Sequence, residues 1–493
     1  MNIKFLTKAQ TLLLILLIAG FFVRLYKFDN PVADWHSWRQ ADTSAVSRNF
    51  VTGGFDVLHP KFDDLSNVAS GTDNPNGYRF VEFPIYNVLQ AAGYKYMGFI
   101  TLEEWGRLIT IFASLISTAF LFLLIRKRFG KKAALLTSFF FLFLPFNIYY
   151  SRVILPDPSM VMAILGATYF FQLWLEESPK CKVKSPKLFN RTNVLYIISL
   201  LFMTLSLLLK PYALFFTLSM IYLAFEKYGL KFFRKWQLWI FMILSVIPLA
   251  LWRIWMLNFP AGIPASAWLF NGNHIRFRPS FFYWLGYKRL TQLIIGYFGW
   301  IFIIPLFIFK IYKRKDIYFA LSFALSSIIY VSVLATGNVQ HDYYQILTIP
   351  SLSIILGLGS LILINKLNSI YRYLGFILFF VIFALSFYFS WAIVQGYFYI
   401  DNPSIVAAGN YIDKNTPKNA KVIALYQGDT SFLYQTKRKG WASLSKSVPE
   451  LINLGADYLV IANPTKVDLG IGKTYKIVTE NKQFVLFNLK EKP

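Results

Sequence analysis

Long apolar runs constrain this chain more than any other feature of its sequence. A helix that crosses a bilayer needs about 20 mostly apolar residues, because the hydrocarbon layer is roughly 30 Å thick. The 493-residue sequence contains about eleven runs of this kind, which predicts a polytopic α-helical membrane protein. The runs lie near residues 10–28, 105–125, 133–150, 159–175, 193–209, 212–226, 237–257, 290–309, 317–335, 344–365 and 373–392.

The composition excludes two other classes of protein. Hydrophobic residues make up 56% of the chain and charged residues only 15%, whereas a soluble globular chain carries roughly 25% charged residues. The net charge of +26 does not predict a nucleic-acid partner, because such proteins gather Lys and Arg on one exposed face, and here they lie between apolar runs. A single cysteine, Cys181, excludes an internal disulfide framework and a Cys-based metal cluster.

The positions of Lys and Arg predict the orientation in the membrane, since short basic loops stay in the cytoplasm. Basic segments occupy every second connection, at residues 126–132, 180–191, 227–235 and 310–315. The alternate connections, near 152–157, 210–211 and 337–341, carry at most one basic residue each and are expected to face outward. We therefore expect an integral protein of the plasma (inner) membrane, with a cytoplasmic N-terminus and an extracytoplasmic C-terminus. Much of the positive charge then serves topology and contact with anionic lipid.

Two outward segments are too long to be simple connections. Residues 29–104 and 258–289 exceed the 12–15 residues beyond which loops are usually functional or disordered. Within the first, residues 85–98 are amphipathic and predict a helix that lies along the membrane surface. From residue 395 the composition becomes that of a soluble domain, with apolar strands, short helices and a final hairpin. The predicted organisation is a transmembrane domain over 1–394 and an extracytoplasmic α/β domain over 395–493, with about 11 to 13 spans in the former.

The densest group of reactive side chains follows the first apolar run. Asp34, His36, Arg39, Gln40 and Asp42 lie within ten residues of one another at the membrane surface, where charge is costly and tends to be functional. If residues 37–50 are helical, Arg39 and Asp42 share one face. The simpler interpretation is an exposed Asp42 paired with Arg39.

Further polar groups are predicted at the outward ends of later runs. Asp157 precedes Pro158 and is either an active-site acid or the N-cap of a helix. Lys210 either faces a site or extends toward the lipid headgroups. His341, Tyr343 and Tyr344 open another run, where the alternative is a capping Asp342 beside interfacial tyrosines.

Together these outward groups are typical of one kind of reaction. A cavity that holds both a base and anion-binding groups suits displacement of a phosphate leaving group by a deprotonated hydroxyl. The sequence contains no Walker A, His-Glu-x-x-His or Asp-x-Asp motif; no cofactor or metal ligand set is predicted, and a divalent cation stays compatible with the chemistry. The acids are Asp34, Asp42, Glu82 and Asp157, the cations are Arg39, Lys210, Arg276 and Arg278, and His341 adds an imidazole.

An ordered set of short motifs resembles the GT-C fold glycosyltransferases. The nearest groups are the protein O-mannosyltransferase and aminoarabinose transferase relatives, and the resemblance is clearest over residues 1–230 and 336–365. The motifs are His36-Ser-Trp-Arg-Gln-Ala-Asp-Thr43, Glu82-Phe-Pro-Ile-Tyr86, Gly106-Arg-Leu108, Arg126 to Gly130, Pro156-Asp-Pro158, Lys210-Pro211 and His341-Asp-Tyr-Tyr344.

The resemblance implies an activity. Such enzymes take a sugar from a polyprenyl-phosphate carrier and pass it, with inversion, to an acceptor protein, lipid or glycan outside the cytoplasm. A first-loop acid acts as base; Asp42 is our choice, with Asp34 as the alternative. The family's usual Asp-Glu is replaced here by Arg39-Gln40, and the Lys that often follows the Glu-x-Pro acid is replaced by Phe83.

The resemblance also implies roles for the other predicted residues. In place of the missing lysine, Arg39, Lys210 and Arg276 or Arg278 are expected to hold the carrier phosphate. Asp157 is expected to line the site, and Tyr343 or Tyr344 to contact the carrier. His36, Gln40, Glu82 and His341 complete the expected substrate-binding set.

Two other functions stay open from the sequence. A transporter or flippase for lipid-linked sugars would also need many spans, although it should carry ionisable groups deep within them. A polymerase or ligase that uses diphosphate-linked oligosaccharides would differ only in its donor.

Overall fold

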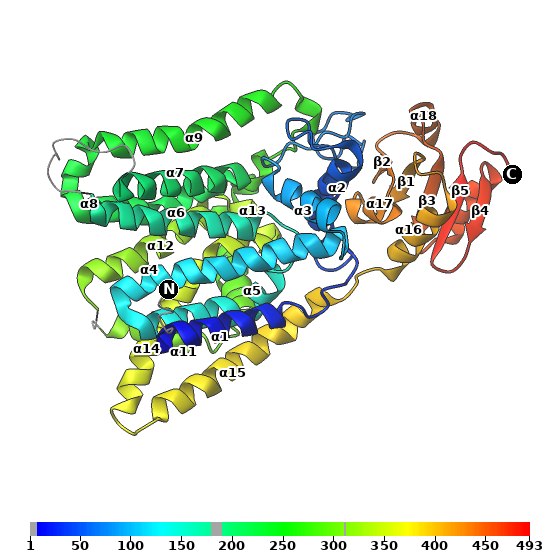
Figure 1. The fold of residues 1–493 in the computed structure, drawn as a ribbon. Coiled ribbons are helices and arrows are strands. Elements are labelled where there is room, and N and C mark those ends of the chain that lie inside the picture. Colours follow the sequence, from blue (N-terminus) through cyan, green and yellow to red (C-terminus); the bar gives the residue numbers. More distant parts are fainter. Residues whose placement is uncertain (1–6, 179–189, 310–311) are drawn as a thin grey trace.

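The computed structural model describes residues 7–178, 190–309 and 312–493. It consists of a bundle of long helices and a small sheet-containing domain at one end of that bundle (Figure 1). The predicted fold class, a polytopic helical protein with a small C-terminal α/β domain, is confirmed.

Within the described residues, eight helices are long and apolar enough to cross a membrane. The chain is therefore an integral membrane protein. The spans are built on α4 (Leu102–Phe143), α6 (Asp157–Glu177), α7 (Arg191–Leu209), α8 (Leu218–Tyr228, preceded by η1, Pro211–Thr217, and followed by η2, Gly229–Arg234), α9 (Trp236–Met256), α12 (Arg314–Val333), α14 (Ile349–Asn368, preceded by η7, Asp342–Thr348) and α15 (Leu374–Val394).

The remaining predicted runs are helical but differ from simple spans. The run at 133–150 follows the run at 105–125 within α4, and a break at Gly130, where φ is 85°, separates the two helices. Glycine adopts this conformation because it has no Cβ. The run at 290–309 is divided between the π-helix η6 (Tyr283–Ile294) and α11 (Trp300–Ile308). The first run forms α1 (Lys8–Val23), which has only 16 residues.

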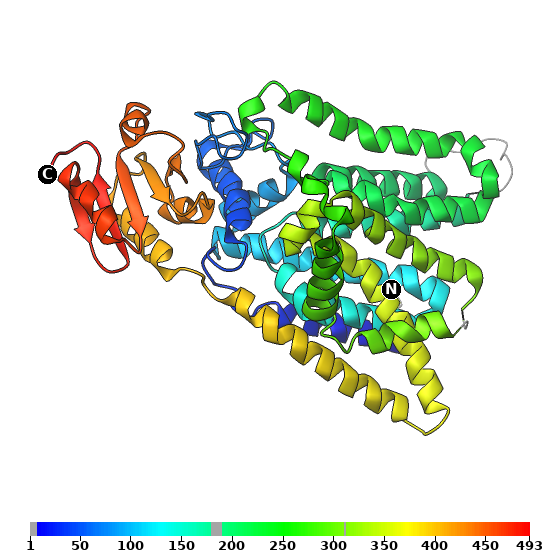
Figure 2. The ribbon, with the colours of Figure 1, turned by 180° about the vertical axis from the view of Figure 1, so that it is seen from behind.

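The long loops and the basic connections lie at opposite ends of the bundle. Helices α2 (Ser37–Gly53) and α3 (Ile85–Met97) of the first loop lie at the end that carries the sheet domain. The bend inside α4 and the end of α8, next to the basic segments 126–132 and 227–235, lie at the other end, as both views show (Figures 1 and 2). Most of the predicted basic connection at 180–191, and part of the one at 310–315, lie outside the described residues.

Helix α3 is the amphipathic helix predicted on the membrane surface. Its 13 residues are too few to span the hydrocarbon layer. It packs against α2, and the side-chain amide of Asn87 donates to the carbonyl of Thr43 at 2.7 Å. Helix α2 is thereby fixed between the bundle and the C-terminal domain.

The C-terminal domain is a five-stranded mixed sheet. Its strands are β1 (Lys421–Leu425), β2 (Lys439–Trp441), β3 (Tyr458–Ala462), β4 (Lys476–Glu480) and β5 (Phe484–Asn488), in the order β2-β1-β3-β5-β4. Strand β1 pairs in parallel with β2 and β3, and β5 pairs antiparallel with β3 and β4. Helices α16 (Pro403–Asn415) and α17 (Thr430–Thr436) cover one face, and α18 (Val448–Asn453) covers the other. The sequence did not predict β2 or α17.

Residues of the first loop attach this domain to the bundle. The amide of Leu65 donates to the carbonyl of Gly440 at 2.7 Å, and the amide of Gly440 donates to the carbonyl of Asp63 at 3.0 Å. The loop therefore adds a short parallel pairing beside β2. Helix α17 packs against α2, where Arg48 donates to the carbonyl of Tyr434 at 3.1 Å. These contacts place the β1–α17 connection over the first loop.

Candidate active site

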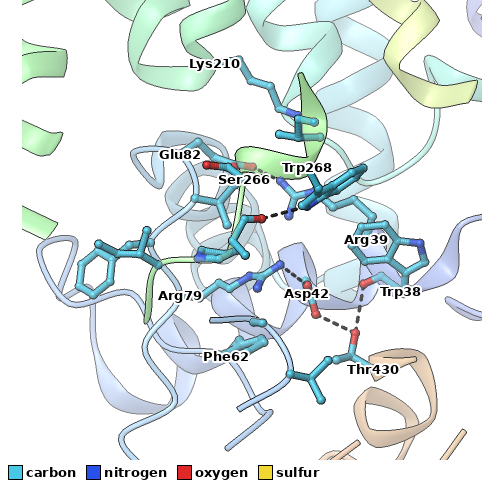
Figure 3. Close-up of a pocket in the computed structure, with 18 of the residues that line it drawn as sticks. Trp38, Arg39, Asp42, Phe62, Arg79, Glu82, Lys210, Ser266, Trp268 and Thr430 are labelled. Atoms are coloured by element: carbon cyan, nitrogen blue, oxygen red, sulfur yellow. Dashed lines mark hydrogen bonds and ion pairs between the residues drawn. The ribbon is translucent and has the colours of Figure 1, made fainter. Parts of the chain in front are cut away.

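A cavity of about 770 Å³ lies where the first loop, the bundle and the C-terminal domain meet (Figure 3). Its walls come from α2, the first loop, the start of η1, the end of α9, residues 263–270 and the β1–α17 connection. Six of the predicted site residues line it: Arg39, Asp42, Glu82, Lys210, Tyr343 and Tyr344. The other seven do not line this cavity: Asp34, His36, Gln40, Asp157, Arg276, Arg278 and His341.

Asp42 lies in the middle of helix α2 and is 4% exposed. Its Oδ2 accepts a hydrogen bond from Nη2 of Arg79 at 2.5 Å, and its Oδ1 accepts one from Oγ1 of Thr430 at 2.7 Å. The alternative of an exposed Asp42 paired with Arg39 is wrong, because Arg79 from the first loop takes that place. Asp42 is thus a buried carboxylate at the cavity wall, held from two sides.

Arg39 precedes Asp42 by one turn and contacts a different acid. Its Nη2 donates to Oε1 of Glu82 at 2.6 Å. Burial disfavours the charged guanidinium, but the negative charges of Glu82, Asp42 and Asp157 outweigh this effect and raise the pKa of Arg39 above its usual value. The second oxygen of Glu82, Oε2, is buried without a hydrogen-bond partner among the described residues. The cavity therefore holds a permanent cation beside a carboxylate with spare acceptor capacity.

Lys210 brings a second cation to the cavity. It is 6% exposed, and its side chain points toward Arg39 and Glu82 (Figure 3). Its Nζ lies 3.0 Å from Oδ1 of Asp157, which is fully buried behind it. Neither simpler alternative describes this pair, because Asp157 makes no capping hydrogen bond at the start of α6 and Lys210 is turned into the protein. Asp157 does not line the cavity itself; it neutralises Lys210 and its charge also favours the cationic form of Arg39.

Asp34 and Gln40 form a buried contact outside the cavity. Arg152 donates to Oδ2 of Asp34 at 3.0 Å, and the amide of Gln40 donates to Oδ1 at 2.7 Å. The carbonyl oxygen of Gln40 accepts from the backbone of Ile154 at 3.1 Å. These bonds tie the start of α2 to the segment before α6.

His36 and His341 do not line the cavity, but the rings of both contact Tyr343, which does. His36 has a left-handed backbone with φ 54°, and its Nε2 lies 2.8 Å from Oδ1 of the buried Asp342. Burial, together with the nearby His36, lowers the pKa of His341 to about 4, so its ring is neutral at pH 7. That ring stacks on Tyr343 with centroids 5.7 Å apart. The two histidines thereby support a tyrosine that lines the cavity.

The two arginines of the second outward loop lie elsewhere. Arg276 donates to the carbonyl of Val333 at 3.3 Å, and Arg278 is exposed to solvent. Neither of them lines the cavity, whereas Arg253, near the end of α9, does.

Several cavity residues were not predicted from the sequence: Asp64, Arg79, Arg253, Asp429 and Thr430. Asp429 caps α17 through a hydrogen bond to the amide of Ser431 at 2.7 Å. Burial, and then the negative charge of Asp42, raise its pKa. Asp429 precedes Thr430 in an ordinary helix-cap pattern, so no signal in the sequence connects this segment with residue 42.

In the part of the chain that the structure describes, no three His, Cys, Asp or Glu side chains are grouped as ligands of one ion. The cavity is lined by four cationic side chains of the described residues, Arg39, Arg79, Lys210 and Arg253, of which Arg79 is paired with Asp42.

The helical bundle, the amphipathic first loop and the soluble domain above an acid- and cation-lined cavity define a protein with the GT-C glycosyltransferase fold. The family model described as dolichyl-phosphate-mannose-protein mannosyltransferase matches residues 82–255, which confirms the predicted resemblance. None of the curated proteins compared with the chain matches it significantly.

Two solved structures illustrate the shared fold. ArnT from Cupriavidus metallidurans bound to undecaprenyl phosphate is 14% identical, and the match covers 96% of this chain and 97% of ArnT with a TM-score of 0.66. The archaeal oligosaccharyltransferase AglB from Archaeoglobus fulgidus, in complex with an inhibitory peptide and a dolichol-phosphate, is also 14% identical. That match covers 97% of this chain and 74% of AglB with a TM-score of 0.58.

Proposed function

We propose that this protein transfers a sugar from a polyprenyl-phosphate carrier to an acceptor hydroxyl. The observation that carries the proposal is one cavity at the end of the bundle that holds a buried carboxylate, Asp42, together with the cations Arg39 and Lys210. The shared fold supports it, since the ArnT structure contains undecaprenyl phosphate and the AglB structure contains a dolichol-phosphate.

In the proposed reaction Asp42 is the general base. It removes the proton of the acceptor hydroxyl while the oxygen attacks the anomeric carbon of the donor sugar. The bond between that carbon and the phosphate oxygen breaks, and its electron pair leaves with the carrier phosphate. Because attack and departure occur on opposite faces of the carbon, the configuration inverts.

Two cations, Arg39 and Lys210, stabilise the phosphate leaving group. Arg39 and Lys210 are fixed by Glu82 and Asp157 before any substrate binds, so they stabilise the developing phosphate charge without reorganising. Lys210 lies between α7 and η1 at the end of a span, and Leu209, Pro211, Tyr212 and Leu249 line the cavity around it. This arrangement suits a phosphate at headgroup depth attached to an apolar prenyl chain.

The sidedness of the reaction follows from the proposed topology. The basic connections at 126–132 and 227–235 lie at the end of the bundle opposite the cavity, and short basic loops are retained in the cytoplasm. We therefore place the cavity and the C-terminal domain on the extracytoplasmic side of the plasma membrane. The acceptor is a hydroxyl of a protein, a lipid or a glycan.

The test measures sugar transfer by purified protein in detergent. Radiolabelled polyprenyl-phosphate sugars serve as donors, and extracted membranes of a deletion strain supply the acceptor. We expect Asp42→Asn to lower transfer by about 10²- to 10⁴-fold, the usual contribution of a general base. Because the substitution also leaves Arg79 without its buried acid, thermal unfolding in detergent verifies that the variant is folded. Asp56→Asn is the control, because Asp56 lies in the same loop with a side chain that is 62% exposed.

The outcomes separate the competing functions. Retained transfer by Asp42→Asn would contradict its role as base. A transporter would produce no labelled product in detergent, where there are no compartments. A polymerase or ligase would accept only a diphosphate-linked donor.

A further inference from the structure

The β1–α17 connection of the C-terminal domain reaches into the cavity. Residues 427–430 line its wall, and Thr430 lies across the cavity from Lys210 (Figure 3). Gln427 and Gly428 both have positive φ values, 53° and 80°, which turn the chain toward the first loop. The soluble domain therefore supplies part of the wall where the proposed base lies.

Thr430 contacts the base itself. Its Oγ1 lies 2.7 Å from Oδ1 of Asp42 and 3.3 Å from the carbonyl of Trp38. A hydroxyl has one proton to donate, and the nearer, negatively charged oxygen is the stronger acceptor. The hydrogen bond to Asp42 is therefore the one that we assign.

This hydrogen bond fixes the direction of the carboxylate. Arg79 holds Oδ2 and Thr430 holds Oδ1, so the plane of the Asp42 carboxylate is set from both sides. A carboxylate offers about four acceptor positions in total, which leaves positions free for the proton of an acceptor hydroxyl. A base that is positioned in advance loses less entropy on reaching the reacting geometry.

The rest of α17 keeps Thr430 in place. Gln435 donates to the carbonyl of Val32 at 2.8 Å, and Arg48 donates to the carbonyl of Tyr434 at 3.1 Å. These contacts lie on the same short helix but do not line the cavity. They offer a way to separate docking of the domain from action on the base.

We propose that Thr430 is a positioning residue for Asp42, so that the C-terminal domain forms part of the active site. The proposal rests on the proposed function, since it assigns to Thr430 an effect on the base of that reaction. It gives the soluble domain a role in the chemical step.

The test compares Thr430→Val, which removes the hydroxyl at nearly constant volume, with Thr430→Ser, which keeps it. We expect Thr430→Val to lower kcat by roughly tenfold to hundredfold, the range of hydrogen bonds to charged groups, with the donor KM little changed. Thr430→Ser should retain most of the activity. Gln435→Met is the matched control for docking, and thermal unfolding in detergent verifies that each variant is folded.

The pH dependence distinguishes positioning from a structural role. A hydrogen bond to the ionised form stabilises it, so its loss should move the acid limb of the kcat profile of Thr430→Val to higher pH by up to about one unit. The other charged groups that face Asp42 are Arg39, Arg79, Asp64 and Asp429, and they are the same in every variant.

The outcomes decide between the two proposals. If Asp42→Asn is inactive while Thr430→Val matches the wild type in kcat and pH profile, the role of Thr430 is refuted and the proposed function stands. Equal losses in Thr430→Val and Gln435→Met without a pH shift would also refute it, because docking alone would then explain both. An active Asp42→Asn would instead refute the assignment of the base.

Discussion

Replacing Lys210 tests both the buried ion pair and the binding of the carrier. Lys210 and Asp157 are 6% and 0% exposed, with 3.0 Å between Nζ and Oδ1. Lys210→Met keeps the length of the side chain but leaves Asp157 as a buried carboxylate without this cation. Loss of one partner of a buried pair typically costs about 3–5 kcal/mol, so we expect the free energy of unfolding to fall by about that amount.

The double variant Lys210→Met/Asp157→Asn separates stability from binding. It removes both charges, so most of the lost stability should return. Binding of the carrier should stay weakened by about 1.5–3 kcal/mol, roughly tenfold to hundredfold in Kd, because the phosphate lacks one charged donor. Lys466→Met, at an exposed position in the C-terminal domain, should change neither quantity.

The assay combines chemical unfolding in detergent with titration of undecaprenyl phosphate. If the double variant binds the carrier as tightly as the wild type, Lys210 does not contact the phosphate. If Lys210→Met is as stable as the wild type, the ion pair between Lys210 and Asp157 does not stabilise the fold as argued above. Either result would refute part of the reasoning.

Two further predictions concern orientation and metals. In a Cys181→Ser background, Val467→Cys, at a position 85% exposed in the C-terminal domain, should react with a membrane-impermeant maleimide in intact cells; protection until lysis would place the domain in the cytoplasm. Sugar transfer should persist after EDTA treatment, because the arginines Arg39, Arg79 and Arg253 and Lys210 supply positive charge to the cavity; a loss that Mg²⁺ or Mn²⁺ restores would contradict this.

The spans could be predicted from the sequence because their signal is local. A run of apolar residues must be helical in lipid, where every backbone group needs a partner within the segment. The interruptions were harder to foresee. Gly130 breaks the helix between two of the predicted runs. The run at 290–309 becomes a π-helix followed by α11, which depends on packing against neighbouring helices.

The site was only partly predictable for a similar reason. Asp42 and Arg39 stand out because charge at a membrane surface is costly, and both line the cavity. Their partners could not be inferred, since Arg79 is 37 residues and Thr430 is 388 residues from Asp42. Composition alone could not tell that Arg276 and Arg278 lie away from the cavity while Arg253 lines it. Such pairings arise from the tertiary fold.

The most direct test of the central claim is the product of a single purified reaction. Wild-type protein in detergent, given a polyprenyl-phosphate sugar of known anomeric configuration and the acceptor extract, should yield a glycosylated product and free polyprenyl phosphate. We predict that NMR of the new linkage will show the inverted configuration, and that Asp42→Asn will form no product. A product of retained configuration, or none from any monophosphate-linked donor, would contradict the account.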